Sequence, residues 1–269
     1  MSTGSALKAQ LLPILVSTTL WLGFCFLTYV LLGWLNLSSL VRVKLPTSLT
    51  LWTVGLGVFI YLKTAVDYAL FVGNLMSQNP GTKNRLLMNV GTQVGCFVGV
   101  TLILVLWAFF KELRWLMAGL LVLAAAVLFG LGDNSQDHFE GLPTWLKRPL
   151  EWFFQVTRPL VERLTFFMPD GELDPKPLFP WPLFLVSMII PFALGADDLA
   201  GYLALLTPGD AFGLLVGIYL GDALIDMALF LKPSWTVRVV TNPWVSYLGA
   251  WFFVGLGALS LYDAVRLFI

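Results

Sequence analysis

The sequence predicts an all-α membrane protein with seven transmembrane helices, arranged as one N-terminal helix followed by two inverted three-helix repeats. Three observations predict this class. Hydrophobic residues make up 58% of the 269 residues and charged residues only 12%, which is far more apolar than a soluble domain. The mean hydropathy is +0.83. The apolar residues form continuous runs, whereas a membrane β-barrel shows short alternating segments, and three of these runs recur along the chain.

Seven apolar runs satisfy the rule that a helix needs about 20 apolar residues to cross the hydrocarbon core. They are 11–35, 50–76, 86–110, 114–132, 181–206, 211–231 and 244–268. The first run is longer than the apolar part of a signal peptide, so we expect a retained membrane helix. Lysine and arginine favour the segments on the side of the N-terminus, which predicts a cytoplasmic N-terminus and an outside C-terminus in a plasma or inner membrane.

The runs divide the chain into four parts. These are an N-terminal helix and loop (1–45), a first repeat (46–133), a linker (134–180) and a second repeat (181–269). The linker sequence PTWLKRPLEWFFQVTRPLVERLTFF mixes aromatic and basic residues with prolines, so we expect one or two short helices at the cytoplasmic membrane surface. Before it, GDNSQDHFE begins with the alternating polar residues of a calcium-binding loop. However, His138 stands where that loop requires glycine and Thr144 where it requires glutamate, so no metal site is predicted there.

Internal similarity defines the two repeats. Segments 64–69, 88–99 and 116–131 can be laid on 195–200, 214–225 and 248–263. The first alignment puts Asp67 opposite Asp198, and the second aligns two glycine pairs, Gly91 with Gly217 and Gly95 with Gly221. Because each unit contains an odd number of crossings, the second copy enters the membrane from the opposite side. Inverted repeats of this kind are typical of secondary transporters, whose substrate site lies near the membrane midplane.

Acidic and polar residues interrupt these apolar runs, although a charge at mid-bilayer costs about 2.5–3.5 kcal/mol on insertion scales and so indicates a functional position. In the sixth run, Asp222 and Asp226 share one helical face with Tyr219. The repeat-equivalent face of the third run carries Asn89 and Gln93. Hydrogen bonding within the bundle is the alternative role of these groups, and both roles stay open at this point.

Each repeat also carries an acid near its start. Lys63 precedes Asp67 by one helical turn, so these two side chains can form a neutralising ion pair. In the second repeat, Asp197 and Asp198 are adjacent and point about 100° apart on a regular helix. Both can face one site only where the helix is broken, and the nearby Pro191 and Gly195 favour such a break.

The motifs around these acids resemble the cadmium-resistance (CadD-like) transporters of the LysE superfamily and, more distantly, its TerC-type and manganese-exporter proteins. The similar segments are TAVDYALFVGNL (64–75), NVGTQVG (89–95), FALGADDLAGYLALL (192–206) and NPWVSYLGAWFFVGLGALSLYD (242–263). The resemblance implies that Asp67 and Asp198 are motif carboxylates. Tyr68 and Leu199 replace an acid and an amide of the family's pattern, and the first membrane helix is an addition to it.

With this resemblance, the polar residues predict a secondary transporter that exports a divalent cation and is coupled to proton exchange at intramembrane carboxylates. Carboxylate, amide and carbonyl oxygens favour Mn²⁺ or Ca²⁺, with Cd²⁺ as a further substrate to test. The predicted metal ligands are Asp67, Asp198, Asp197, Asp222, Asn89 and Gln93, and the predicted substrate-coupling residues are Lys63 and Asp226.

Other classes fit the sequence less closely. An amino-acid exporter could use Lys63 together with an aspartate, and a non-transporting membrane subunit of a larger complex would use the polar groups for packing. A thiol-exchanging carrier needs facing cysteines, but Cys25 lies outside the repeats and Cys96 aligns with Asp222. The chain has no GxxxxGK[ST] motif, so we expect no ATP-driven transport by this chain alone, and its formal net charge of zero predicts no nucleic-acid partner. We also expect no enzyme activity and no cofactor. The expected partners are a divalent cation and membrane lipid, and homo-oligomerisation is left open.

Overall fold

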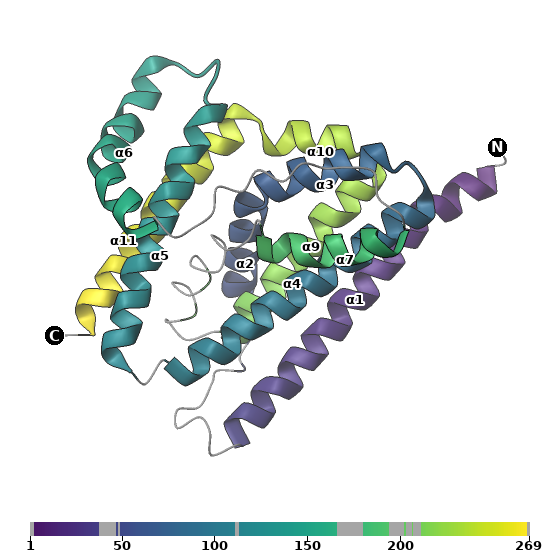
Figure 1. The fold of residues 1–269 in the computed structure, drawn as a ribbon, viewed down its shortest axis with the longest axis horizontal. Coiled ribbons are helices and arrows are strands. Elements are labelled where there is room, and N and C mark those ends of the chain that lie inside the picture. The colour runs from purple at the N-terminus through teal and green to yellow at the C-terminus, as the bar shows by residue number, and fades with distance from the viewer. Residues whose placement is uncertain are drawn as a thin grey trace. The chain divides into compact units, whose positions relative to one another are not determined.

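A computed structural model of the chain describes residues 3–37, 47, 49–110, 113–165, 180–193, 202, 206 and 211–267. Helices form 92% of these residues, and no strand occurs among them. The helices are labelled in Figure 1: α1 (Thr3–Leu37), α2 (Leu51–Thr64), α3 (Val66–Gln78), α4 (Thr82–Phe110), α5 (Arg114–Asn134), η1 (Ser135–His138), α6 (Thr144–Thr165), α7 (Pro180–Ala193), α9 (Ala211–Leu231), α10 (Pro233–Val240) and α11 (Pro243–Arg266).

Five helices in the described ranges are long and apolar enough to cross a membrane. Their apolar parts are Leu11–Leu37, Thr82–Ala108, Trp115–His138, Ala211–Leu231 and Pro243–Arg266. The bent pair α2 and α3 gives a sixth candidate span. The prediction of an all-helical membrane class is therefore confirmed in this coarser form, whereas the run 181–206 extends beyond the described residues, so the count of seven stays a prediction.

The run predicted as one span at 50–76 is two helices. α2 ends at Thr64 and α3 begins at Val66, with a bend of 64° between the two apolar segments. The Thr64 hydroxyl donates hydrogen bonds to the carbonyls of Ile60 and Tyr61, at 3.1 and 3.2 Å. Such side-chain bonds to the preceding turn compete with the helical ladder and favour bends.

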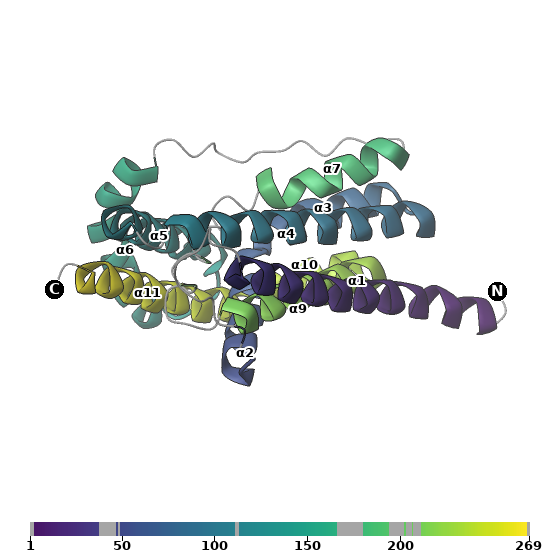
Figure 2. The same ribbon diagram turned by 90° about the horizontal axis from the view of Figure 1, so that it is seen from below.

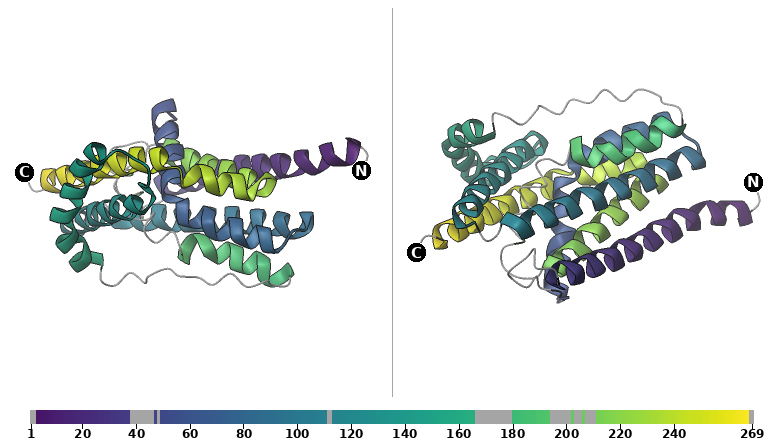
Figure 3. Two further views of the ribbon diagram at one scale, coloured as in Figure 1. Left: turned by 90° about the horizontal axis from the view of Figure 1, so that it is seen from above. Right: turned by 60° about the horizontal axis from the view of Figure 1, so that its bottom comes forward.

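One compact unit contains α1, α2, α3, α7, α9 and the part of α4 up to residue 102. Within this unit, Figures 2 and 3 show α4 between α7 on one side and α9 with α1 on the other. Fifteen of the 21 residues of α9 are buried, so α9 is the central helix of the unit.

Glycines set two close helix contacts in this unit. A Cβ atom on Gly217 would overlap the carbonyl oxygen of Val54 on α2, and one on Gly95 would overlap the carbonyl oxygen of Met188 on α7. Hence α2 packs on α9, and α7 packs on α4, with backbone against backbone. In both pairs, rising residue numbers on one helix meet rising numbers on the other, so the helices of each pair run parallel.

The second compact unit contains α5, η1, α6 and α11. α5 and α11 run antiparallel, because Ser260 Oγ donates to the Leu121 carbonyl at 2.8 Å while Gly257 meets the ring of Phe129. In the described part of the linker, η1 is followed by one helix of 22 residues, α6, which continues through its two internal prolines. Leu150 and Phe154 of α6 are fully buried in a cluster whose other members are Phe139, Leu142 and Ala250.

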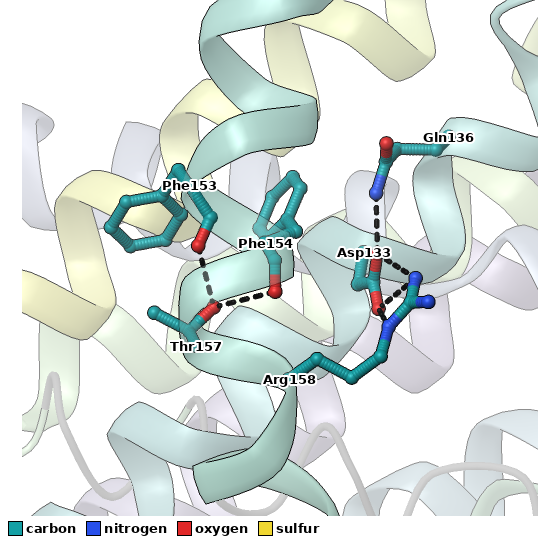
Figure 4. A network of polar contacts seen from close by, with 6 residues as sticks. All are labelled: Asp133, Gln136, Phe153, Phe154, Thr157 and Arg158. Atoms are coloured by element: carbon teal, nitrogen blue, oxygen red, sulfur yellow. Dashed lines mark hydrogen bonds and ion pairs between the residues drawn. The ribbon is translucent and has the colours of Figure 1, made fainter.

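A polar contact joins α6 to the end of α5 beside this cluster (Figure 4). The Arg158 guanidinium donates to both carboxylate oxygens of Asp133 at 2.9 Å, and Gln136 donates to the same carboxylate. One face of α6 is thus bound to its own protein. The opposite face leaves Trp145 and Trp152 exposed, at 71% and 67%.

Candidate functional site

Two carboxylates lie in the middle of the first unit, one helical turn apart on α9. Asp222 is 2% exposed and Asp226 is 0% exposed. Their position follows from the sequence pattern, because residues i and i+4 share one helical face and α9 is apolar and buried on nearly every side. A buried carboxylate without hydrogen-bond partners is strongly unfavourable, so the groups around this pair decide what it can do.

The bent pair of helices supplies one phenol to each carboxylate. Tyr61 of α2 donates a hydrogen bond to Asp222, and Tyr68 of α3 donates one to Asp226. The two rings are in edge contact, with centroids 6.4 Å apart. The break at Ala65 lies between the two tyrosines, so each half of the broken helix is bound to a different aspartate of α9.

α4 approaches the same pair from the other side. Thr92 Oγ1 donates to Asp226 Oδ2 at 2.6 Å. Cys96, one turn further along α4, lies beside Asp222. Rising numbers on α4 therefore meet falling numbers on α9, and the two helices cross antiparallel at the acidic pair.

A second polar cluster adjoins this crossing and consists of Ser17, Asn89 and Gln93. Gln93 Nε2 donates to Ser17 Oγ and to Asn89 Oδ1, both at 2.8 Å, and Asn89 Nδ2 donates to Ser17 Oγ at 3.1 Å. All three side chains are buried, with at most 2% exposed. Gln93 also lies beside Asp226, so the two clusters adjoin each other.

The structure brings together four of the predicted site residues: Asp222, Asp226, Asn89 and Gln93. Lys63 is also buried, at 6% exposure, but it lies two residues after Tyr61 and hence about 200° around α2 from it. The Cβ atom of Lys63 therefore lies on the side of α2 opposite Tyr61, the residue that contacts Asp222. Among the described residues, no group of three or more His, Cys, Asp or Glu side chains forms a metal cluster.

The side chains of three predicted ligands lie outside the part of the chain that the structure describes. Asp67 is in the first turn of α3, but its side chain is outside the described set, and Asp197 and Asp198 are outside it altogether. The predicted pairing of Lys63 with Asp67 and the predicted break before Asp197 thus stay predictions.

Four residues of the site were not predicted from the sequence: Tyr61, Tyr68, Thr92 and Ser17. A signal for two of them was present, because Tyr61 and Tyr68 are seven residues apart and Tyr68 occupies the position where the similar family has an acid. No local pattern distinguishes Thr92 or Ser17 from other hydroxyl residues in apolar helices, since their partners are 134 and 76 residues away.

The predicted repeat aligns two of the residues that meet where α4 and α9 cross. The alignment that pairs Gly91 with Gly217 adds 126 to a residue number of α4, and the same shift pairs Cys96 with Asp222. These two aligned residues lie beside each other where α4 and α9 cross. One pair of residues that the predicted repeat aligns, Cys96 and Asp222, therefore meets at the site.

Comparisons of the chain with family models, with curated proteins and with solved structures find no match.

Proposed function

We propose that this chain is a secondary transporter that moves a divalent metal cation across a membrane, with Asp222 and Asp226 as the central carboxylates of its path. The observation that carries the proposal is the acidic pair itself. Two carboxylates are buried one turn apart in an apolar helix, and the hydroxyls of Tyr61, Tyr68 and Thr92 donate hydrogen bonds to them. Acids buried in membrane helices mark ion pathways and proton relays by default.

The packing of the helices supports a transporter with inverted repeats. The first helix of the predicted first repeat, α2, packs parallel to the second helix of the other repeat, α9. The first helix of the predicted second repeat, α7, packs parallel to the second helix of the first, α4. Exchanging the two repeats converts one contact into the other, as a twofold axis in the membrane plane requires.

The donor set favours a hard cation. Carboxylates, the Thr92 hydroxyl and the amides of Asn89 and Gln93 are oxygen ligands of the kind that Mn²⁺ and Ca²⁺ take. Cys96 is the one thiol beside the pair in the described part of the chain, and a single thiol favours Cd²⁺ or Zn²⁺ less than a set of thiolates does. The resemblance to CadD-like transporters keeps Cd²⁺ among the substrates to test, with Asp67 and Asp198 as further ligands.

Proton exchange is the coupling that this site favours. Two ionised carboxylates one turn apart repel each other in a low dielectric, and either protons or a divalent cation can remove that repulsion. Protons and cation then compete for the same oxygens. Cation binding should weaken as the pH falls, and efflux of the cation should draw on the proton gradient.

The test is flux in proteoliposomes that contain the purified chain and an enclosed metal-sensitive dye. Mn²⁺, Ca²⁺, Cd²⁺ and Zn²⁺ are added one at a time, with and without a pH gradient. We expect saturable entry of Mn²⁺ or Ca²⁺, and a loss of at least about tenfold, or 1.4 kcal/mol, in Asp226→Asn and Asp222→Asn. Asp198→Asn should abolish transport as well.

Asp263→Asn is the matched control, because it makes the same substitution in an apolar helix of the other compact unit, α11. Normal flux in Asp226→Asn and Asp222→Asn would contradict the proposed site. Flux of an amino acid in place of a cation would favour the amino-acid exporter. A chain that carries neither substrate and co-purifies with a stable complex would support the non-transporting subunit.

A further inference from the structure

The N-terminal helix lies against the centre of its unit. Trp21 Nε1 of α1 donates to the carbonyl oxygen of Val216 on α9 at 3.2 Å, and the Thr28 and Tyr219 hydroxyls are 3.2 Å apart. Phe24 of α1 stacks on Phe97 of α4, with ring centroids 4.4 Å apart. α1 thus contacts both helices that cross at the acidic pair, although the sequence marks it only as an addition outside the repeats.

Ser17 is the point where α1 enters the polar cluster. Its side chain is fully buried, and its hydroxyl oxygen accepts hydrogen bonds from Gln93 Nε2 at 2.8 Å and from Asn89 Nδ2 at 3.1 Å. A hydroxyl in a membrane helix commonly donates to the preceding turn of its own helix, as Thr19 does to the Leu15 carbonyl at 2.7 Å. Ser17 instead accepts from two amides of another helix and donates its own hydroxyl to Asn89 Oδ1 of that helix, at 3.5 Å.

These contacts fix the orientation of the Gln93 amide. Its Nε2 donates to Ser17 Oγ and to Asn89 Oδ1, both at 2.8 Å. The same side chain also makes a hydrogen bond to Asp226. The cluster that Ser17 joins therefore places the Gln93 amide next to the carboxylate.

We infer that α1 is part of the transport site, with Ser17 as a positioning residue that holds the Gln93 amide beside Asp226, where the cation binds. This inference rests on the proposed transport of a cation through the acidic pair. Without the Ser17 hydroxyl, one N–H of Gln93 loses its acceptor, and the amide can rotate away from the orientation in which it serves the cation. Groups that orient metal ligands typically contribute 10- to 100-fold in metal affinity.

The experiment compares the concentration dependence of Mn²⁺ and Ca²⁺ flux in four variants reconstituted as full chains. Ser17→Ala should raise KM roughly 10-fold or more, with a smaller change in the maximal rate. Gln93→Ala should raise KM to a similar extent. In the double variant Ser17→Ala/Gln93→Ala, KM should equal that of Gln93→Ala alone, because residues that act through one another are not additive.

Thr28→Val is the matched control on the same helix. It removes a buried hydroxyl that contacts Tyr219, away from Gln93, and keeps the shape of the side chain. If α1 only anchors the bundle, Ser17→Ala and Thr28→Val should change thermal stability alike and leave KM unchanged. If Ser17 positions the amide, KM should change in Ser17→Ala and stay the same in Thr28→Val.

Each outcome distinguishes this inference from the proposed function. A wild-type chain with no cation flux overturns both. Flux that is lost in Asp226→Asn, with an unchanged KM in Ser17→Ala, overturns the positioning role of Ser17 alone. Additive increases of KM in the double variant also overturn it, because they would show that Ser17 acts independently of Gln93.

Discussion

A carboxylate in a membrane helix costs about 2.5–3.5 kcal/mol on insertion scales, and α9 carries two of them in full burial. The tyrosines of the broken helix reduce this cost. Tyr61 and Tyr68 each donate a hydrogen bond to one aspartate, and Thr92 adds a second donor to Asp226. Hydrogen bonds to charged acceptors are stronger than those between neutral groups, so these hydroxyls stabilise the folded bundle as well as the site.

Tyr68→Phe tests this contribution. The substitution keeps the ring and removes the hydroxyl, and Asp226 retains Thr92 as a donor. We expect a loss of about 0.6–1.7 kcal/mol in the free energy of unfolding, the range measured for hydrogen bonds between membrane helices. The measurement is unfolding in mixed detergent micelles. Tyr29→Phe, which alters a ring that is 54% exposed, should leave stability unchanged.

A double-mutant cycle distinguishes a specific bond from a general effect of the ring. Once Asp226→Ala has removed the acceptor, Tyr68→Phe should cost much less than it does in the wild-type chain. Equal costs in the two backgrounds would contradict the hydrogen bond as the source of the stabilisation.

At the level of residues, the sequence predicts the acids but not their partners. Asp222 and Asp226 stand out because charges are rare in apolar runs, and Asn89 and Gln93 follow from the repeat. Tyrosine and threonine are common in membrane helices and carry no such signal. Their roles depend on contacts across 134 to 161 positions of the chain, which only the packing of whole helices brings together.

At the level of elements, length and hydropathy predict most of the helices within a few residues. The runs 86–110, 114–132 and 211–231 correspond to Thr82–Phe110, Arg114–Asn134 and Ala211–Leu231. The break between α2 and α3 was not predicted, because the run contains neither proline nor glycine near Ala65. The tyrosine bonds on both sides of the break are long-range contacts, and local propensity does not report them.

The glycine contact between α2 and α9 gives an element-level prediction. A methyl group on Gly217 would overlap the carbonyl oxygen of Val54 and approach Gly57 Cα to 3.0 Å. Because both obstacles are backbone atoms, the helices must move apart, and we expect Gly217→Ala to destabilise the fold by about 1–3 kcal/mol. Thermal unfolding in detergent is the measurement.

Gly255→Ala is the control for this change. A Cβ atom at Gly255 meets nothing within 4 Å, so the better helix propensity of alanine should make the variant neutral or more stable by up to about 1 kcal/mol. Similar losses of stability in Gly217→Ala and Gly255→Ala would show that the close contact between α2 and α9 does not determine the effect.

The attachment of α6 to α5 depends more on packing than on charge. The hydrogen bond to Asp133 and the charge of that carboxylate raise the pKa of Arg158, so its guanidinium stays protonated. However, the Arg158 side chain is 54% exposed, and exposed ion pairs contribute about 0–1 kcal/mol. Phe154 is 1% exposed and lies against Gly132, and replacing a buried phenylalanine by alanine costs about 3–5 kcal/mol.

We therefore expect Phe154→Ala to release α6 and Arg158→Gln to leave it attached. Limited proteolysis of the purified chain measures this, because a released helix exposes cleavage sites between residues 144 and 165 that the packed helix protects. Faster cleavage in Arg158→Gln than in Phe154→Ala would reverse this order and assign the attachment to the ion pair.

At the level of the whole molecule, three helix pairs have the relative directions that the predicted inverted repeats would produce. α2 with α9 and α7 with α4 are parallel pairs, and α5 with α11, the predicted third helices of the two repeats, is an antiparallel pair. An exchange of the two repeats maps the first pair onto the second and the third onto itself. The sequence predicts this symmetry through aligned glycines, but similarity alone does not determine which helices exchange partners.

Inverted repeats predict that equivalent loops lie on opposite sides of the membrane. Leu113, between α4 and α5, and Lys232, between α9 and α11, are exposed and occupy such loops. With the N-terminus in the cytoplasm, a cysteine at position 113 should react with a membrane-impermeant maleimide from outside intact cells. A cysteine at position 232 should react only after the cells are opened. Each single cysteine is placed in a chain in which Cys25 and Cys96 are replaced by serine, and labelling of both positions from the same side would rule out the inverted arrangement.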